Sequence, residues 1–142
     1  MSTFRIREAI WSDVEQIMSI ANKSKELNKV GFLTKDDIDY CINITTKAKF
    51  YVASENENHK IIGFVYGFVE VPSTACLMYI CVDEKWRGKG VGTTLVNDFM
   101  TDIRKYGVSK IYCLTTTEKS SVFFNKVGFD YTGNLLGYME IA

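Results

Sequence analysis

The stretch LMYICVDEKWRGKGVGTT, residues 77–94, constrains the fold of this chain more than any other part of it. It opens with the apolar run Leu77–Val82, which has the length and composition of a buried strand. A polar turn follows, and then the glycine-dense loop Arg87–Gly92 leads into a helical pattern. Glycines let successive backbone N–H groups point at one spot, and a helix start adds unpaired N–H groups and the positive end of its dipole. Together with the charges of Arg87 and Lys89, these features predict a pocket for a phosphate or pyrophosphate.

Three known glycine-loop spacings can be compared with this loop. The phosphate loop of nucleotide hydrolases requires G-x-x-x-x-G-K-[ST], and no Lys–Ser/Thr pair follows the last glycine here. The dinucleotide fingerprint requires G-x-G-x-x-G after the first strand of a parallel unit, whereas this loop has G-x-G-x-G after a later strand. The third spacing, R-x-x-G-x-G, is met by Arg87, Gly90 and Gly92. On spacing alone, an ordinary glycine-rich turn remains an alternative.

The residues before the loop predict one strand, two helices and a three-stranded meander. Alternation of apolar and charged residues predicts the first strand over Phe4–Glu8. Ser12, with Glu15 three residues later, predicts a capping box at the start of a helix that reaches about Leu27, and Thr34 predicts a second helix start. The meander is predicted at Phe50–Ala53, Ile61–Val71 and Leu77–Val82, with Gly63 and Gly67 as bulges or points of close backbone approach and Pro72 ending its second strand.

The residues after the loop predict a crossover helix and a parallel strand. Val91, Leu95, Phe99 and Ile103 recur every four residues, so we expect an amphipathic helix that ends near Gly107. A strand around 111–113 must then run parallel to the strand before the helix. A short helix over about Lys119–Val127 and a closing hairpin of Phe129–Tyr131 with Leu136–Ile141 complete the order β-α-α-β-β-β-α-β-α-β-β. The predicted class is therefore α/β, an α+β mixed sheet with mostly antiparallel strands.

Composition limits the functions that the chain can have. A length of 142 residues predicts a single domain, residues 1–142, and 17 basic residues balance 17 acidic ones, which argues against nucleic-acid or membrane partners. No run of 18 apolar residues and no signal-peptide core is present, so we expect a cytoplasmic protein. The four cysteines form no C-x-x-C pair and read as reduced core residues. A single histidine, His59, excludes a Ser-His-Asp triad and a histidine metal site, so no metal is expected.

Two motifs in the right order resemble the GNAT family of acetyl-CoA-dependent N-acetyltransferases. Val82–Gly92 looks like the central motif of that family, in which a strand ends at the pantetheine arm and the loop holds the pyrophosphate. Ser120–Phe129 is similar to its second motif, an aromatic pair followed by Lys-x-Gly-Phe. The two lie about 30 residues apart, with a helix and a strand predicted between them, and the resemblance covers essentially the whole chain.

The resemblance implies a fold, a cosubstrate and a set of binding residues. In the family, the two parallel strands splay apart at the cofactor, and main-chain groups of the fourth strand bind the pantetheine arm. Acetyl-CoA is then the implied cosubstrate, and an acetyl group passes directly from its thioester to an amine. The positions carried over as cofactor-binding are Ile80, Cys81, Val82, Arg87, Gly88, Lys89, Gly90, Val91, Gly92, Thr93, Thr117, Ser120 and Phe124.

The sequence departs from the family at a position that matters for catalysis. Many members carry a tyrosine as the second of the aromatic pair, and its hydroxyl protonates the leaving thiolate; here that position is Phe124, which has no proton to donate. The candidate catalytic residues are Glu70, near the end of the third strand, and Tyr79, which alternation predicts to share a face with Leu77 and Cys81. For each, a structural role as a solvated strand end or a core aromatic is the alternative.

The chain is therefore predicted to be an N-acetyltransferase that acetylates a primary amine of a small molecule or peptide. The alternative, which Phe124 keeps open, is a non-catalytic or weakly active acyl-CoA-binding module of the same fold. By resemblance, the acceptor site is shaped by the link between the first two helices, 28–33, by the ends of the third and fourth strands, and by the last hairpin around Gly133. Members of the family are often dimers, so a homodimer is a further expectation.

Overall fold

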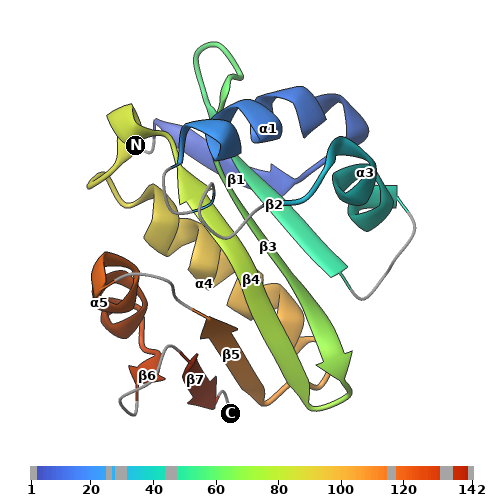
Figure 1. Cartoon of the computed structure of the whole chain (residues 1–142), viewed down its shortest axis with the longest axis vertical. Coiled ribbons are helices and arrows are strands. Elements are labelled where there is room, and N and C mark those ends of the chain that lie inside the picture. Colours follow the sequence, from blue (N-terminus) through green and yellow to red (C-terminus); the bar gives the residue numbers. More distant parts are fainter. Residues whose placement is uncertain are drawn as a thin grey trace.

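A seven-stranded mixed sheet forms the centre of the protein, shown in Figure 1 as a computed structural model. The structure describes residues 3–24, 27, 32–43, 48–114, 118–131 and 136–140. The strand order is β1-β2-β3-β4-β5-β7-β6, and only β4 and β5 are parallel neighbours. The mostly antiparallel sheet with one parallel pair is confirmed. The strands are β1 (Phe4–Glu8), β2 (Ala48–Glu55), β3 (Ile61–Val71), β4 (Thr74–Val82), β5 (Lys110–Leu114), β6 (Asp130–Tyr131) and β7 (Leu136–Glu140).

Helices cover both faces of this sheet. Helices α1 (Val14–Lys23) and α3 (Lys35–Asn43) pack on one face, and α4 (Val91–Arg104) packs on the other, where α5 (Glu118–Lys126) contributes Phe124 to the same core. Two single-turn 3₁₀ helices, η1 (Trp11–Asp13) and η2 (Glu84–Trp86), precede α1 and the glycine loop. The face with α1 and α3 is called the α1 face below, and the other the α4 face.

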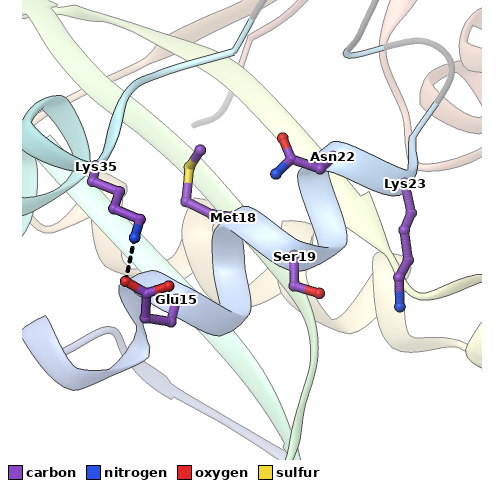
Figure 2. Close-up of a pocket in the computed structure, with 6 residues that line it drawn as sticks. All are labelled: Glu15, Met18, Ser19, Asn22, Lys23 and Lys35. Atoms are coloured by element: carbon purple, nitrogen blue, oxygen red, sulfur yellow. Dashed lines mark hydrogen bonds and ion pairs between the residues drawn. The ribbon is translucent and has the colours of Figure 1, made fainter.

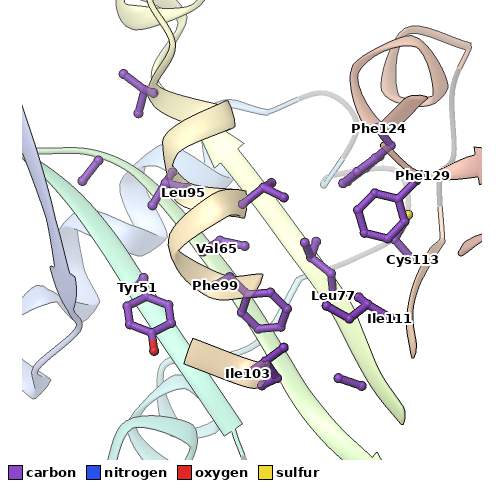
Figure 3. Packing of buried hydrophobic residues seen from close by; sticks show 14 of the residues in the cluster. Tyr51, Val65, Leu77, Leu95, Phe99, Ile103, Ile111, Cys113, Phe124 and Phe129 are labelled. Atoms are coloured by element: carbon purple, nitrogen blue, oxygen red, sulfur yellow. The ribbon is translucent and has the colours of Figure 1, made fainter. Parts of the chain in front are cut away.

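The helical spacing predicted after the glycine loop produces the larger of the two cores. Leu95, Phe99 and Ile103 of α4 are fully buried where this helix packs on β2, β3 and β4 (Figure 3). Apolar side chains at every fourth position fall on one side of a helix, so the whole stripe leaves water together. Gly107 then takes a left-handed backbone conformation after the helix, φ 85°, as its C-cap pattern predicts.

Gly67 of β3 permits close packing between the sheet and α4. A Cβ at this position would lie 2.4 Å from the ring of Phe99 and 2.5 Å from the Cys76 carbonyl oxygen. The pairing of β3 with β4 also shifts register next to Gly67. The predicted close approach at Gly67 is therefore confirmed, because any side chain here would displace the central ring of the core, whereas the extra residue at this register shift lies on β4.

The start of the first helix differs from the prediction. Ser12 is exposed and caps no helix; α1 begins at Val14 and ends at Lys23 rather than near Leu27. Asp13, only 4% exposed, organises the turn instead. Its carboxylate accepts a hydrogen bond from the Ile10 N–H at 2.8 Å, and two more from the terminal nitrogens of the Arg7 guanidinium at 2.8 and 3.0 Å. A bidentate pair to arginine is stronger than a hydroxyl cap, so it determines where the helix begins.

The second helix begins as predicted. Thr34 Oγ1 accepts the Asp37 N–H at 3.1 Å, and the Asp37 carboxylate accepts the Thr34 N–H at 3.0 Å. This reciprocal capping box satisfies backbone donors of the first turn that the helix itself leaves unpaired. Ile38 on the next turn is completely buried against the α1 face.

Candidate active site

The parallel strands β4 and β5 separate before β4 ends. Their pairing covers Thr74–Leu77 with Lys110–Cys113, whereas β4 continues to Val82. Among the described residues, the last residues of β4 therefore have β3 as a neighbour on one side and an open edge on the other. The predicted splay is present, and it exposes main-chain groups that a sheet would otherwise pair.

A β-bulge at Met78 marks the point of separation. Tyr79 lies opposite Tyr66 and Leu77 lies opposite Gly67, so Met78 has no partner on β3. Such an extra residue bends its strand and increases its twist, which carries the end of β4 away from β5. Met78 itself is 39% exposed.

The bulge also corrects the predicted face of Tyr79. Leu77 packs in the core on the α4 face, whereas Tyr79 and Cys81 pack against the core on the α1 face. Tyr79 therefore shares a face with Cys81 but not with Leu77, because the extra residue between them breaks the alternation.

Alternation of the ladder identifies which main-chain groups face the open edge. Asp83 donates its N–H to Ile62 of β3 at 2.8 Å, so Cys81, two residues earlier, directs its N–H and C=O toward β3 as well. Ile80 and Val82 then direct theirs toward the open edge. The edge is therefore presented by Ile80 and Val82 rather than by Cys81, whose side chain is buried under α1 with Sγ 3.9 Å from the Ile20 carbonyl oxygen.

The glycine loop joins this edge to the start of α4. Gly88 and Gly90 have φ of 76° and 87°, a left-handed conformation that strains other residues, and no heavy atom lies within 4 Å of either Cβ position. Gly90 is the N-cap of α4, and no side chain caps this helix start. The N–H groups of its first turn therefore point outward with the positive end of the dipole.

Basic side chains surround the same helix start. Arg87 is exposed and donates from Nε to the Val82 carbonyl oxygen at 3.1 Å, which ties the loop to the end of β4. Lys89 Nζ lies 5.1 Å from the centre of the Trp86 ring, a cation–π distance. No acidic residue lies in the first turn of α4. The sequence-predicted loop residues are thus brought together as one open, positively polarised surface.

The second predicted motif contributes a contact that sequence reasoning missed. A Cβ on Gly92 would lie 3.1 Å from the ring of Phe123, so the first aromatic of the pair packs on the helix start, which requires a residue without a side chain. Phe124, the second, is 5% exposed and packs edge-on against both Phe123 and Phe129 in the α4-face core (Figure 3). Thr117 lies outside the described residues, and Ser120 lies on α5 with its side chain outside them.

Tyr79 lies beside the open edge on the α1 face. The Phe32 ring packs edge-on against it with ring centres 4.9 Å apart. Burial raises the pKa of the Tyr79 hydroxyl above its ordinary value, and the negative charge of Asp37 raises this pKa further. The Tyr79 hydroxyl therefore keeps its proton to higher pH than an ordinary tyrosine and can donate a hydrogen bond.

Glu70 lies away from the splay. It precedes Val71, which pairs with Thr74 at the other end of the β3–β4 ladder, and six residues of β4 separate Thr74 from Ile80, roughly 20 Å of strand. The Glu70 carboxylate accepts a hydrogen bond from the Tyr112 hydroxyl. The expectation that Glu70 is the best-placed base is therefore not supported by its position.

A separate hollow lies on the outer flank of α1, next to α3. It has a volume of about 450 Å³ and contains the Glu15–Lys35 ion pair at 2.5 Å (Figure 2). None of the residues predicted from the sequence to bind or react lines it. Among the described residues, no cluster of three or more histidine, cysteine or acidic side chains is placed to hold a metal ion, and no helix is long and apolar enough to cross a membrane.

A sequence model described as Acetyltransferase (GNAT) domain matches residues 46–131, more than half of the chain. The chain belongs to the GNAT acetyltransferase family. The matched range includes the splayed strand, the glycine loop and the aromatic pair. The elements that form the candidate site therefore all lie within the range that matches the GNAT domain.

Solved structures with the GNAT fold cover nearly the whole chain. Ard1 from Thermoplasma volcanium is 21% identical, with a TM-score of 0.81 over 99% of each chain. The PaiA N-acetyltransferase from Thermoplasma acidophilum, in complex with coenzyme A, is 17% identical, with a TM-score of 0.83 over 99% of each chain. The ribosomal-protein-S18-alanine N-acetyltransferase from Escherichia coli is 15% identical, with a TM-score of 0.77 over 98% of this chain and 94% of its own. No curated protein sequence matches the chain.

Proposed function

We propose that this protein binds acetyl-CoA and transfers its acetyl group directly to a primary amine of a small molecule or peptide. One observation carries the proposal: the open edge of β4 runs directly into an uncapped helix start that has two glycines in left-handed conformations and two basic side chains. An edge of free amide groups suits the pantetheine arm, and a positively polarised helix start suits a pyrophosphate.

The cosubstrate would be held by groups that face the open edge and the loop in the part of the chain that the structure describes. Ile80 offers its N–H and C=O at the edge, and Val82 offers its N–H, since its C=O already accepts from Arg87. The pyrophosphate would lie over residues 87–93, where the open space beside Gly88 and Gly90 leaves room for it. When bound, acetyl-CoA supplies an activated acyl group with a thiol leaving group.

The acceptor amine must approach from the α1 face and react as the neutral base. Its nitrogen forms a bond to the acyl carbon, the C–S bond breaks, the amine loses a proton and the leaving thiolate gains one. A backbone N–H at the open edge can stabilise the oxyanion. Phe124 has no proton to donate to the leaving thiolate. Tyr79 lies beside the open edge and keeps its proton at neutral pH, so we assign this donation to Tyr79.

Calorimetry with acetyl-CoA, followed by a thiol-release assay over a panel of amines, tests the proposal. Arg87→Ala should weaken acetyl-CoA binding about tenfold, because a charged hydrogen bond to phosphate contributes on the order of 1.5–3 kcal/mol. Lys105→Ala, at the C-cap of α4 and so at the opposite end of that helix from the loop, serves as the matched control and should bind normally. Equal affinities for the two variants would show that the loop does not hold the pyrophosphate.

A second candidate function is a non-catalytic acyl-CoA-binding module of the same fold. The burial of Phe124, which leaves no hydroxyl at the position where many family members have one, favours it. Tight acetyl-CoA binding without thiol release on any amine would support this candidate over the enzyme.

A further inference from the structure

One half of the α1 face carries aromatic rings that the described helices cover only in part, although α3 reaches Tyr66 through a hydrogen bond between the Tyr66 and Cys41 side chains. Helices α1 and α3 pack over β2 and the start of β3, whereas the other ends of β3 and β4 have no described helix on this side (Figure 1). The rings there belong to Tyr66 and Phe68 of β3, Tyr79 of β4 and Tyr112 of β5. We call these four residues the aromatic platform.

The register places the platform rings side by side. Phe68 pairs with Cys76, and Cys76 pairs with Tyr112, so these side chains stand in one row across three strands. Tyr66 lies opposite Tyr79, with ring centres 6.4 Å apart and ring planes 21° from parallel. The ring centres of Tyr66 and Phe68 are 6.2 Å apart. The platform is therefore continuous from the middle of the sheet to the open edge of β4.

The platform is partly exposed, which distinguishes it from the two cores. All four rings are half-buried, whereas Cys76 beneath them is 2% exposed. Phe32 stands on Tyr79 at one end, and Met78 is exposed at the bulge. Half-buried rings in a continuous group mark a surface that accepts apolar or flat ligands, since each ring can bury further area against them.

The charges beside the platform are chiefly negative. The charge of Asp37 reaches Tyr79 strongly enough to raise its pKa, and Glu70 accepts a hydrogen bond from Tyr112 at the far end. Among the described residues, the basic side chain on this face at that end is that of Lys110, which is exposed and lies two residues before Tyr112 on the same strand. A carboxylate over the centre of the platform would thus meet Asp37 and no adjacent cation.

We propose that the acceptor is a primary amine carried on an aromatic or flat apolar body, without a carboxylate beside the amine. The body lies on the aromatic platform and the amine reaches the open edge at Tyr79. This inference rests on the proposed acetyl transfer and names its substrate class. Cation–π attraction to the same rings would favour a diamine instead, so the two classes are separated by experiment.

Acetyl transfer to matched amines tests the inference. 2-Phenylethylamine should show a kcat/KM about 10–100-fold above that of ethylamine, the range that an extra apolar group in a binding site provides. It should also exceed phenylalanine, which differs by one carboxylate, and putrescine, which has a second ammonium instead of a ring. Equal rates with ethylamine or phenylalanine, or a preference for putrescine, would overturn the inference.

Variants of the platform locate the effect. Phe68→Leu keeps an apolar side chain but removes a ring, and should reduce the preference for 2-phenylethylamine over ethylamine severalfold at unchanged affinity for acetyl-CoA. Tyr106→Leu removes a ring that is 47% exposed outside the platform, near Lys49, and should leave the preference intact. A preference that survives Phe68→Leu unchanged would place the acceptor elsewhere.

Binding without turnover separates the two hypotheses. Calorimetric titration of 2-phenylethylamine into the CoA-saturated protein should show binding that phenylalanine does not show. If this binding is present but no amine is acetylated, the proposed acetyl transfer fails while the platform stands. If acetylation occurs but follows no aromatic preference, the acetyl transfer stands and the platform assignment is wrong.

Discussion

Phe124 and Tyr79 together determine how this site could handle protons. Phe124 occupies the position of the thiolate-protonating tyrosine in many family members, and its ring is enclosed by Phe123 and Phe129. Tyr79 approaches the same open edge from the other face of the sheet and holds its proton to higher pH than free tyrosine. A hydroxyl lost on one side of the splay can thus be replaced by one on the other.

Tyr79→Phe should lower kcat about 100-fold, at the lower end of what a positioned general acid contributes, and leave acetyl-CoA affinity unchanged. Because the pKa of Tyr79 is raised, the active protonated form persists above the ordinary tyrosine pKa of about 10. The wild-type pH–kcat profile should therefore fall only beyond about pH 10, and the variant should lose this alkaline fall. A variant profile with the wild-type height and shape would exclude Tyr79 as the proton donor.

Gly67→Ala should destabilise the fold by about 1–3 kcal/mol, the range for overpacking a well-filled core. The new methyl would overlap both the Phe99 ring and the Cys76 carbonyl, and neither can move without disturbing the α4 core. Urea unfolding measures the loss. Gly63→Ala, whose nearest contact would be 3.1 Å, is the control and should lose clearly less.

At the scale of elements, the periodicity of apolar residues predicted the order of the helices and strands, but it did not predict the irregular point in the pairing of β3 with β4. The order of strands and helices, the parallel pair and the glycine loop all follow from apolar spacing and glycine positions. The bulge at Met78 does not, because Leu77–Val82 is apolar at every position. A strand with no polar alternation carries no signal of its register.

Local capping signals failed where a distant partner competed. Ser12 and Glu15 form the pattern of a capping box, but Arg7 on β1 holds Asp13 through two hydrogen bonds and shifts the helix start. Thr34 and Asp37 had no such competitor, and their box formed. The pairing of β3 with β4 likewise decides which face Tyr79 occupies and how far Glu70 lies from the open edge. The spacing of residues within one strand predicts neither.

Deletion of Met78 should abolish the binding site for acetyl-CoA while leaving the fold intact. Without the bulge, Leu77 and Tyr79 become neighbours on opposite faces and every later residue of β4 keeps its present face. We expect folding with near-normal thermal stability, continued pairing of β4 with β5, and a large loss of acetyl-CoA binding because the edge closes. Met78→Ala keeps the bulge and should bind normally; tight binding by the deletion variant would show that the bulge does not cause the splay.

At the scale of the whole molecule, the sheet buries several phenols and a thiol that ionise in the alkaline range. Burial is the largest cause of the raised pKa values of Tyr51, Tyr66 and Tyr79. Burial also raises the pKa of the Cys76 thiol to about 11. For Tyr112 the largest cause of the raised pKa is its hydrogen bond to Glu70. These groups are distributed over β2, β3, β4 and β5, so the effect belongs to the sheet rather than to the site.

The fold should therefore lose stability as the pH rises from 8 to 10.5. In the unfolded chain tyrosine ionises near pH 10, whereas the folded protein holds its phenols neutral, so above that value the unfolded state binds fewer protons and is favoured. A phenol that stays neutral in the folded protein accounts for about 1 kcal/mol at pH 10.5 by this linkage. Urea unfolding under reducing conditions at the two pH values measures the difference. Tyr51→Phe removes the most buried of these phenols and should reduce the pH dependence; a free energy of unfolding that stays constant to pH 10.5 would show that the phenols ionise in the folded protein.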